Sequence, residues 1–356
     1  MNEPDVVVER RGWAGFITLN RPKALNALNL GMVRAIAAAL DDFAADDRVT
    51  RVVAMSAGGR AFCAGGDIRV LYEQGRAGDH AAQLAFWREE YVLNRRIKRY
   101  GKPYVALVDG LVMGGGVGLS AHGAHVVASE RYDFAMPEVG IGFFPDVGAT
   151  YLLPRLPDRI GRCLALTGEH ANAGDGLALG LADRFVASAA MPELAKALAS
   201  KAPLEEILPA VTADAADAPA GRLLADRKAI ATWFGGESIT ACLSGLAEGA
   251  AKGSALAKAA HAAMLAKSPT SQAIALRQVQ LGASLSFEEA MKVEFRIVSR
   301  ICRAVDFYEG VRAVIIDKDN KPRWRPARHE DVAAEAVEAY FAPLGADELA
   351  FDGAPA

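Results

Sequence analysis

The sequence predicts an α/β fold with a helical C-terminal region. Strands, Gly-rich loops and helices alternate over residues 1–190, with connections long enough for crossovers, which is typical of α/β or repeated ββα layouts. From about residue 190 onward the pattern is helical and rich in alanine, and the next clear strand is Arg312–Asp317. Only 7% of the residues are aromatic, which favours helix over an all-β sandwich.

Hydrophobic periodicity and turn residues place the elements of the N-terminal half. Residues 6–8 and 13–19 are predicted strands of a hairpin that turns at residues 10–12. Asn29 is a predicted N-cap, because apolar residues follow it at helical spacing over residues 30–45. Farther along we expect strands at Arg51–Ser56, Pro103–Asp109 and His125–Ser129, a helix at 80–99, and Gly-rich loops at 58–67 and 114–118.

The length of 356 residues suggests two domains, or one large domain with an appendage. The segment 213–221 (ADAADAPAG) has the composition of a linker and marks a soft boundary near residues 190–220. We therefore expect a core over residues 1–200 and a helical region over residues 201–356.

Composition excludes several classes of protein. A net charge of −3 argues against a nucleic-acid-binding protein, and no apolar run reaches the ~18 residues of a membrane span. Residues 1–5 (MNEPD) lack the character of a targeting leader, so a cytoplasmic location is expected. The four cysteines are far apart in the sequence, which predicts reduced thiols and neither a zinc site nor a disulfide framework: Cys63, Cys163, Cys242 and Cys302.

Glycine is concentrated in one stretch that has the features of a ligand site. Ten of the 34 glycines fall between positions 101 and 150, and four of them lie at 114–118, between a buried strand and a helix. Unpaired N–H groups at such a helix start can stabilise a developing negative oxygen; a tight turn that happens to need glycine is the alternative. Residues 116–121 (GVGLSA) also fit a dinucleotide-binding pattern, but the next strand begins too soon for a crossover helix.

A second Gly-rich segment, residues 58–68, follows another strand and ends at Asp67, a residue suited to capping a helix. Two Gly-rich loops that each follow a strand could supply two convergent N–H donors, which is the minimal oxyanion hole.

The segment 134–148 carries two carboxylates, Glu138 and Asp146, among apolar residues. Burial raises the pKa of a carboxyl group and makes it a candidate general base or nucleophile. The alternatives are that Glu138 caps a turn and that Asp146 is the N-cap of a helix starting at Val147. We favour a functional role for Glu138 and leave the role of Asp146 open at this point.

Other residues are weaker candidates. Ser120 and His122 lie two apart on a predicted helix and so cannot form a nucleophile–base pair. Glu89 and Glu90 precede a basic stretch, and a surface position is their default interpretation.

Four ordered motifs resemble the crotonase (enoyl-CoA hydratase/isomerase) superfamily: residues 19–28 (LNRPKALNAL), 61–68 (AFCAGGDI), 110–116 (GLVMGGG) and 136–138 (MPE). The resemblance implies a spiral of ββα units that binds acyl-CoA. It also implies an oxyanion hole for the thioester carbonyl, formed by the backbone N–H groups of Gly66 and Gly115.

One branch of the superfamily fits better than the hydratases. Hydratases use two catalytic glutamates, whereas the first of these positions is Gly118 here and only the second, Glu138, is retained. Asp146 stands eight residues after Glu138, where hydratases tend to have glycine. This pattern resembles the 3-hydroxyisobutyryl-CoA hydrolase family of valine catabolism. Further matches are residues 86–91 (FWREEY), 114–120 (GGGVGLS), 141–148 (IGFFPDVG), 151–156 (YLLPRL) and 306–319 (DFYEGVRAVIIDKD).

The resemblance also implies the site. The substrate-contacting positions of the family fall on Glu90, Gly115, Glu138 and Asp146. The resemblance therefore replaces the default surface interpretation of Glu90 with a place in the site. Ala64, Asp67 and Ile68 are further expected substrate-binding residues. Lys318 and Lys321 could reach CoA phosphates, with solvated side chains as the alternative.

The expected reaction is hydrolysis of a short 3-hydroxyacyl-CoA thioester, with 3-hydroxyisobutyryl-CoA as the expected substrate. Glu138 acts as nucleophile or general base, and Asp146 accepts a hydrogen bond from the substrate 3-hydroxyl. No metal or other cofactor is expected beyond the CoA of the substrate, and a homo-oligomer is a further expectation. Two alternatives stay open: an enoyl-CoA hydratase or isomerase, and a non-catalytic acyl-CoA-binding protein.

Overall fold

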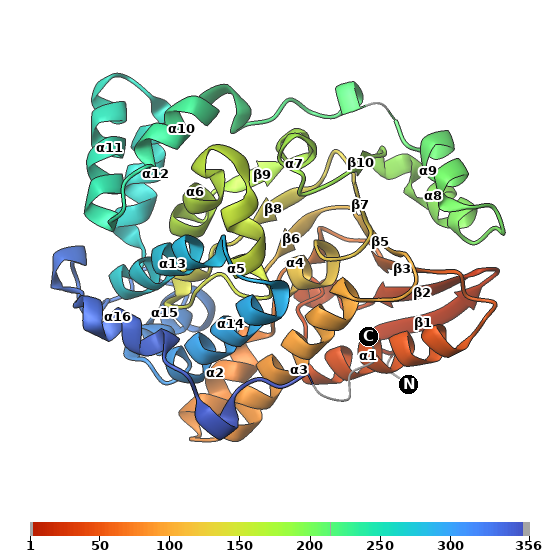
Figure 1. Cartoon of the computed structure of the whole chain (residues 1–356), viewed down its shortest axis with the longest axis horizontal. Coiled ribbons are helices and arrows are strands. Elements are labelled where there is room, and N and C mark those ends of the chain that lie inside the picture. Colours follow the sequence, from red (N-terminus) through yellow and green to blue (C-terminus); the bar gives the residue numbers. More distant parts are fainter. Residues whose placement is uncertain (1–2, 214, 352–356) are drawn as a thin grey trace.

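Two β-sheets and the helices that cover them are visible in the computed structural model, which describes residues 3–213 and 215–351 (Figure 1). Residues 1 and 2 of the N-terminal segment, residue 214 of the linker-like segment and residues 352–356 lie outside this description. The strands are β1 (Val6–Arg11), β2 (Ala14–Leu19), β3 (Arg51–Ser56), β4 (Ala61–Cys63), β5 (Tyr104–Val108), β6 (Leu111–Met113), β7 (His125–Ala128), β8 (Asp133–Ala135), β9 (His170–Asn172) and β10 (Arg184–Phe185).

Helices cover the sheets in the N-terminal half and are the main regular element of the C-terminal half. They are α1 (Leu30–Ala45), α2 (Ile68–Arg76), α3 (His80–Lys98), α4 (Gly115–Ser120), α5 (Ala149–Leu152), α6 (Ile160–Thr167), α7 (Ala173–Leu179), α8 (Met191–Leu198), α9 (Leu204–Val211), α10 (Arg227–Trp233), α11 (Ile239–Ala251), α12 (Ala255–Ala266), α13 (Pro269–Gly282), α14 (Phe287–Ile301), α15 (Val305–Val311) and α16 (Ala334–Phe341).

The chain winds as a spiral of ββα units. The larger sheet has the order β1-β2-β3-β5-β7-β10, and the smaller has the order β4-β6-β8-β9. Thus β3, β5 and β7 enter the larger sheet, and the strand that follows each of them enters the smaller one. Gly110, with φ of 117°, makes the bend from β5 to β6, where a Cβ would lie 2.6 Å from the Arg60 carbonyl oxygen. The predicted repeated ββα layout is confirmed.

The N-terminal hairpin and first helix follow the local sequence closely. β1 and β2 pair antiparallel from Val6–Leu19 to Arg11–Ala14, so the first strand is longer than the predicted residues 6–8. The Asn29 side chain accepts a hydrogen bond from the Met32 N–H at 2.9 Å and begins α1, as predicted.

Apolar side chains cover both faces of the larger sheet. One cluster joins Phe16, Val53 and Val105 of the sheet to Leu194 and Leu198 of α8. The other face belongs to a large cluster that also includes side chains of α1, α3 and the C-terminal helices α13 and α14. Burial on both faces explains why β5 is apolar throughout. The division of the chain into residues 1–200 and 201–356 stays a prediction.

Three predicted elements are wrong. The expected loop at 114–118 is helical from Gly115, where α4 begins. The expected loop at 58–67 contains strand β4, which pairs in parallel with β6. The expected strand Arg312–Asp317 is a turn of π-helix, Arg312–Ile316, that continues α15. Its run of apolar, mostly β-branched residues is typical of a strand, but only Ala313 of the run is buried.

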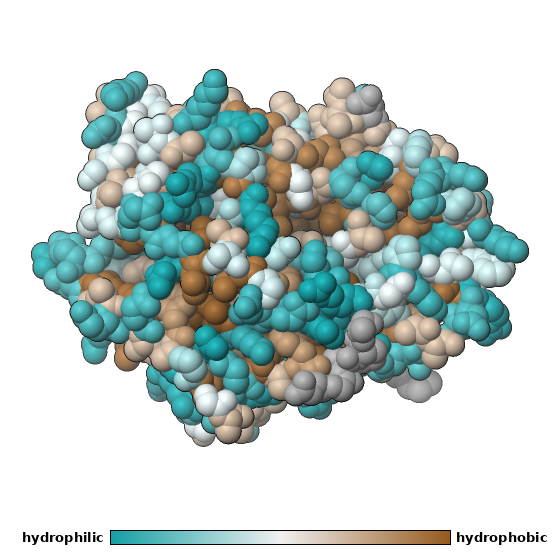
Figure 2. All heavy atoms as spheres, viewed as in Figure 1, coloured by the Kyte–Doolittle hydropathy of each residue, from teal (hydrophilic) through white to brown (hydrophobic). Residues whose placement is uncertain are grey.

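The surface mixes hydrophobic and hydrophilic residues. Figure 2 shows hydrophobic residues gathered in parts of one face within a larger hydrophilic area. None of the helices in residues 3–213 and 215–351 combines the length and apolar character needed to cross a membrane. The four cysteines are free and buried.

The packing of α4 on β4 gives a first prediction. A Cβ at Gly116 would lie 2.4 Å from the Cys63 carbonyl oxygen, so alanine has no room there without a backbone shift. We expect Gly116→Ala to lower the free energy of unfolding by about 1–3 kcal/mol, measured by urea denaturation. Gly101→Ala is the control, because a Cβ at Gly101 meets nothing within 4 Å. Equal stability of the two variants would contradict the tight α4–β4 contact.

Candidate active site

One cavity of about 370 Å³ brings together most of the residues predicted for the site. It lies between the Gly-rich segments, helix α3 and the C-terminal region. The predicted site residues that line it are Ala64, Gly66, Ile68, Glu90, Gly115, Glu138 and Asp146.

The two Gly-rich segments meet at the cavity wall. A Cβ at Gly65 would lie 3.7 Å from Gly114 Cα and 3.9 Å from the Gly115 nitrogen. Gly66 directly follows Gly65 and Gly115 is the first residue of α4. Within the described residues, neither the Gly66 nor the Gly115 N–H donates to a backbone carbonyl. Both donors are therefore available at one wall of the cavity.

Glu138 lies beside this wall. Its Oε1 is 3.3 Å from the position of a Cβ at Gly114, and its Oε2 has no hydrogen-bond partner among the described residues. Burial, followed by the charge of Asp146, raises the pKa of Glu138 well above its ordinary value. The residue opens a short 3-10 helix, Glu138–Ile141, and its carboxyl group is aimed at the glycines.

One of the two interpretations of Asp146, that it is the N-cap of a helix, is wrong. Helix α5 begins at Ala149 with Gly148 as N-cap. The Asp146 carboxylate instead accepts a hydrogen bond from the Tyr91 hydroxyl at 2.8 Å. Burial raises the pKa of Asp146 to about 7.

Glu90 is buried and lines the cavity, where the resemblance placed it, so its first interpretation as a surface residue is wrong. Its Oε1 is unpaired among the described residues and lies 2.5 Å from the position of a Cβ at Gly115. Burial and the charges of Asp146 and Glu294 raise the pKa of Glu90 well above its ordinary value. Spacing could have found it, because Glu90 stands four residues after the buried Phe86 on α3.

Asp67 lies between two lining residues but turns its side chain elsewhere. Its carboxylate pairs with Arg21 at 2.8 Å. It occupies the N-cap position of α2, as predicted, but makes no side-chain capping bond. A substrate contact through Asp67 stays a prediction.

Gly118 leaves no room for a side chain. A Cβ there would lie 2.6 Å from the Asn94 side-chain nitrogen and 2.9 Å from the Val147 Cβ. The carboxylate that hydratases carry at this position would displace both neighbours. The structure therefore fills, with Asn94 and Val147, the space that the first hydratase glutamate needs.

Ser120 and His122 bind different backbone carbonyls. The Ser120 hydroxyl donates to the Gly116 carbonyl at 2.8 Å, and His122 Nε2 lies 2.7 Å from the Val147 carbonyl. Burial lowers the pKa of His122 to about 4. The prediction that they form no nucleophile–base pair is confirmed.

Two residues at the site were missed by sequence reasoning. Tyr91 follows Glu90 on α3, and its hydroxyl reaches Asp146. Glu294, on α14, is buried and accepts the N–H groups of Gly148 and Thr150, each at 2.8 Å. Glu294 lies in a helix that also carries exposed charges, but helical spacing could have found it, because the buried Met291 and Ile297 stand three residues before and after it.

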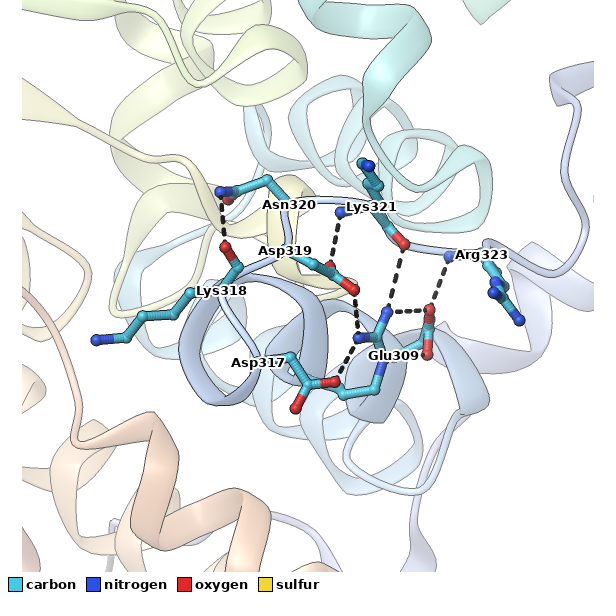
Figure 3. Close-up of polar contacts among 8 residues, drawn as sticks. Glu309, Asp317, Lys318, Asp319, Asn320, Lys321 and Arg323 are labelled. Atoms are coloured by element: carbon cyan, nitrogen blue, oxygen red, sulfur yellow. Dashed lines mark hydrogen bonds and ion pairs between the residues drawn. The ribbon is translucent and has the colours of Figure 1, made fainter.

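Segment 317–321 forms part of the cavity rim. Asn320, with φ of 54°, lines the cavity. The Arg312 guanidinium donates to the carboxylates of Asp317 at 2.6 Å and Asp319 at 2.8 Å. In Figure 3 the dashed lines of these contacts converge on the guanidinium group that the two carboxylates share. The network fixes the shape of the rim.

Lysines stand near this rim. Lys267 lines the cavity, and burial lowers its pKa. Lys318 and Lys321 are exposed, and Figure 3 shows the Lys318 side chain extending away from the network. Their contact with CoA phosphates stays a prediction. In the described part of the chain, no group of three His, Cys, Asp or Glu is arranged to hold a metal ion.

The arrangement has the parts of an acyl-transfer site. Two unpaired N–H groups face the same wall as the Glu138 carboxyl, and Asp146 and Glu90 stand beside it in the same cavity. A carbonyl oxygen seated on the N–H groups would place its carbon next to Glu138.

Comparison with known proteins supports this reading. A family model described as enoyl-CoA hydratase/isomerase matches residues 14–341. The mitochondrial 3-hydroxyisobutyryl-CoA hydrolase of Xenopus tropicalis is 44% identical, covering 98% of this chain and 91% of its own length. The human protein of the same name is 41% identical, again covering 98% of this chain and 91% of its own length.

Solved structures share the fold over nearly the whole chain. A crystal structure named carnitinyl-CoA dehydratase, from Mycobacterium thermoresistibile, has a TM-score of 0.92 and 39% identity, covering 99% of this chain and 100% of its own. One named enoyl-CoA hydratase, from Rhodobacter sphaeroides 2.4.1, has a TM-score of 0.90 and 43% identity, covering 98% and 100%. The predicted crotonase-like fold with a helical C-terminal region is confirmed.

The raised pKa of Asp146 predicts a pH-dependent stability. The folded chain keeps a proton on this carboxyl up to about pH 7, whereas the ordinary pKa, 3.8, applies in the unfolded chain. Proton binding therefore stabilises the folded state at low pH, and this stabilisation is lost as the pH rises from 3.8 to about 7. Relative to Asp146→Asn, the wild type should lose up to about 1.4 kcal/mol of unfolding free energy per pH unit.

Urea denaturation at pH 5, 6 and 7 measures this difference. Asp42→Asn, which changes an exposed carboxyl on α1, is the control. A constant difference between wild type and Asp146→Asn over this pH range would contradict the prediction.

Proposed function

The chain belongs to the enoyl-CoA hydratase/isomerase family, and we propose that within it the chain is a thioester hydrolase that converts 3-hydroxyisobutyryl-CoA to 3-hydroxyisobutyrate and CoA. The observation that carries the proposal is the site itself: Glu138 is retained beside two free N–H groups, while Gly118 has neither a carboxylate nor room for one. The curated relatives at 41–44% identity bear the name of this hydrolase.

The thioester carbonyl oxygen binds the N–H groups of Gly66 and Gly115. Negative charge develops on this oxygen in the transition state, and one such donor is typically worth about 3–4 kcal/mol. Both donors are fixed before the substrate arrives, one by the bridge between Leu28 and Gly66 and the other by the start of α4. The oxygen therefore meets donors that need no rearrangement.

Glu138 supplies the attack on the carbonyl carbon. Its carboxylate either attacks directly, giving a mixed anhydride that water then opens, or removes a proton from an attacking water. Both routes break the C–S bond, add one water and release CoA as the thiol and the acyl group as a carboxylic acid. The carboxyl must be ionised to act. Burial and the charge of Asp146 raise its pKa, and a hydrogen bond from its own backbone N–H opposes them by favouring the charged form.

Asp146 accepts a hydrogen bond from the substrate 3-hydroxyl and so sets the position of the acyl group. A site built to bind a hydroxyl rejects analogues that lack it, because its own polar group is then left unpaired. The Tyr91 hydroxyl occupies Oδ2 of Asp146, which leaves the other oxygen for the substrate.

Hydration of an enoyl-CoA is the second candidate, because the two structural relatives above carry the names of a dehydratase and a hydratase. Gly118 argues against this reaction, because the position lacks the carboxylate that hydratases carry there. Three expectations stay predictions: that the chain needs no cofactor, that it self-associates, and that it is cytoplasmic. The curated relatives are named as mitochondrial proteins.

Glu138→Gln tests the role of Glu138. With 3-hydroxyisobutyryl-CoA as substrate and free thiol as the readout, we expect kcat to fall about 10²–10⁴-fold, because the amide can neither attack nor accept a proton. Glu89→Gln, which changes a half-buried residue that pairs with Arg34, is the control and should keep wild-type activity.

A parallel assay decides between the candidate reactions. Crotonyl-CoA is followed through the loss of its enoyl absorbance. Hydration without thiol release would show a hydratase in place of the hydrolase. If neither signal is seen, the non-catalytic acyl-CoA-binding protein is the remaining alternative. Full activity of Glu138→Gln would remove this residue from the reaction.

Asp146→Asn tests substrate selection. We expect the ratio of kcat/KM for 3-hydroxyisobutyryl-CoA to that for isobutyryl-CoA to fall about tenfold to a hundredfold, the usual worth of a hydrogen bond to a charged group. Asp42→Asn should leave the ratio unchanged. An unaltered ratio in Asp146→Asn would mean that Asp146 does not read the hydroxyl.

A further inference from the structure

The turn that carries Asp146 has an unusual backbone. Val147 has φ of 53°, in the left-handed region that β-branched residues rarely adopt, and Gly148 follows with φ of 92°. Such a conformation persists only where the surroundings hold it. The direction of the Asp146 side chain therefore depends on the contacts of the next few residues.

Two C-terminal helices supply several of those contacts. Glu294 of α14 accepts the N–H groups of Gly148 and Thr150, each at 2.8 Å. Gln278 of α13 donates to the Pro145 carbonyl and to the Thr150 hydroxyl. The turn is thus bonded to α13 and α14 at its start, its middle and its end.

The two acceptor oxygens of Glu294 match this task. Oε2 receives the Gly148 N–H and Oε1 receives the Thr150 N–H, so each oxygen holds one donor. A glutamine would offer one acceptor and set its own NH₂ against the other N–H. The side chain is fully buried, and burying a carboxyl group is costly unless it is well bonded. The site keeps this carboxyl group in spite of the cost.

Glu294 and Tyr91 approach Asp146 from different directions. Helix α14 packs against α3, and from α3 the Tyr91 hydroxyl bonds the Asp146 carboxylate. One contact fixes the backbone that follows Asp146, and the other fixes its side chain. Together they set where the carboxylate stands in the cavity.

We propose that Glu294 is a positioning residue that holds the left-handed turn at Val147–Gly148 and so keeps Asp146 in place to read the substrate 3-hydroxyl. The inference rests on the proposed function for the identity of the substrate. It assigns to the C-terminal region a part in substrate selection, although Glu294 itself does not line the cavity.

The test is Glu294→Gln, with Glu288→Gln as the matched control. Glu288 stands on the same helix and pairs at the surface with Arg99. For Glu294→Gln we expect kcat/KM for 3-hydroxyisobutyryl-CoA to fall on the order of tenfold to a hundredfold, as when a reacting group is misplaced by about 1 Å. The value for isobutyryl-CoA should change little, so the selectivity ratio falls. Glu288→Gln should keep both values.

A double variant separates positioning from general weakening of the fold. Because Glu294 acts through Asp146, adding Glu294→Gln to Asp146→Asn should lower the selectivity ratio no further than Asp146→Asn alone. Equal losses for both thioesters, or additive losses in the double variant, would overturn the proposal. Where Glu294→Gln does not fold, Glu294→Asp, which keeps both oxygens but withdraws them by one methylene, carries the same test.

A crystal structure of the Glu294→Gln protein gives a readout without activity. Displacement of residues 146–149 relative to the wild type supports the proposal, and an unmoved turn overturns it. Absence of thiol release by the wild-type protein would instead overturn the proposed function, and the crystallographic comparison would still decide the role of Glu294 in holding the turn.

Discussion

The close approach of two backbone segments, Gly65–Gly66 and Gly114–Gly115, is the contact on which the rest of the site depends. The space beside these glycines is where the carboxyl oxygens of Glu138 and Glu90 stand, 3.3 Å and 2.5 Å from the positions that Cβ atoms would take. A side chain at Gly115 would displace Glu90, and one at Gly114 would force Glu138 to shift. The parallel pairing of β4 with β6 brings the two segments together, so the interleaving of the two sheets is what creates the site.

The cavity then gathers carboxyl groups that repel one another. Glu90, Glu138 and Asp146 are buried together, and the charge of Asp146 raises the pKa of both glutamates. Burial is the largest cause of the raised pKa of all three groups, and the charge of Asp146 adds to it for the two glutamates. The Tyr91 hydroxyl of α3 donates a hydrogen bond to Asp146, and Glu294 of the C-terminal helix α14 bonds the turn that follows Asp146. The helical region is therefore part of the site and not only a cover for it.

Sequence reasoning succeeded where the signal is local. The cap at Asn29, the periodicity of α1 and the strand Arg51–Ser56 are set by neighbouring residues, and the Gly-rich motifs lie in the same strand-to-helix turns that form the cavity wall. It failed where packing decides. The run Arg312–Ile316 continues a helix in spite of its β-branched residues, and Glu90 is buried although it sits among charges. Glu294 is 148 residues from Asp146, and only the tertiary fold shows that the two meet.

The names of the relatives differ while their folds agree, and the surroundings of Gly118 bear on that difference. Asn94, fully buried and without a hydrogen-bond partner in the described residues, fills the space beside Gly118 together with Val147. Restoring a glutamate at position 118 would also require a smaller residue at 94 and a relaxed turn at 147, which itself orients Asp146. Interconversion of hydrolase and hydratase is therefore not a single evolutionary step for this chain. Substitutions at the three positions are therefore expected to be non-additive, because the room for each side chain depends on the packing of the other two.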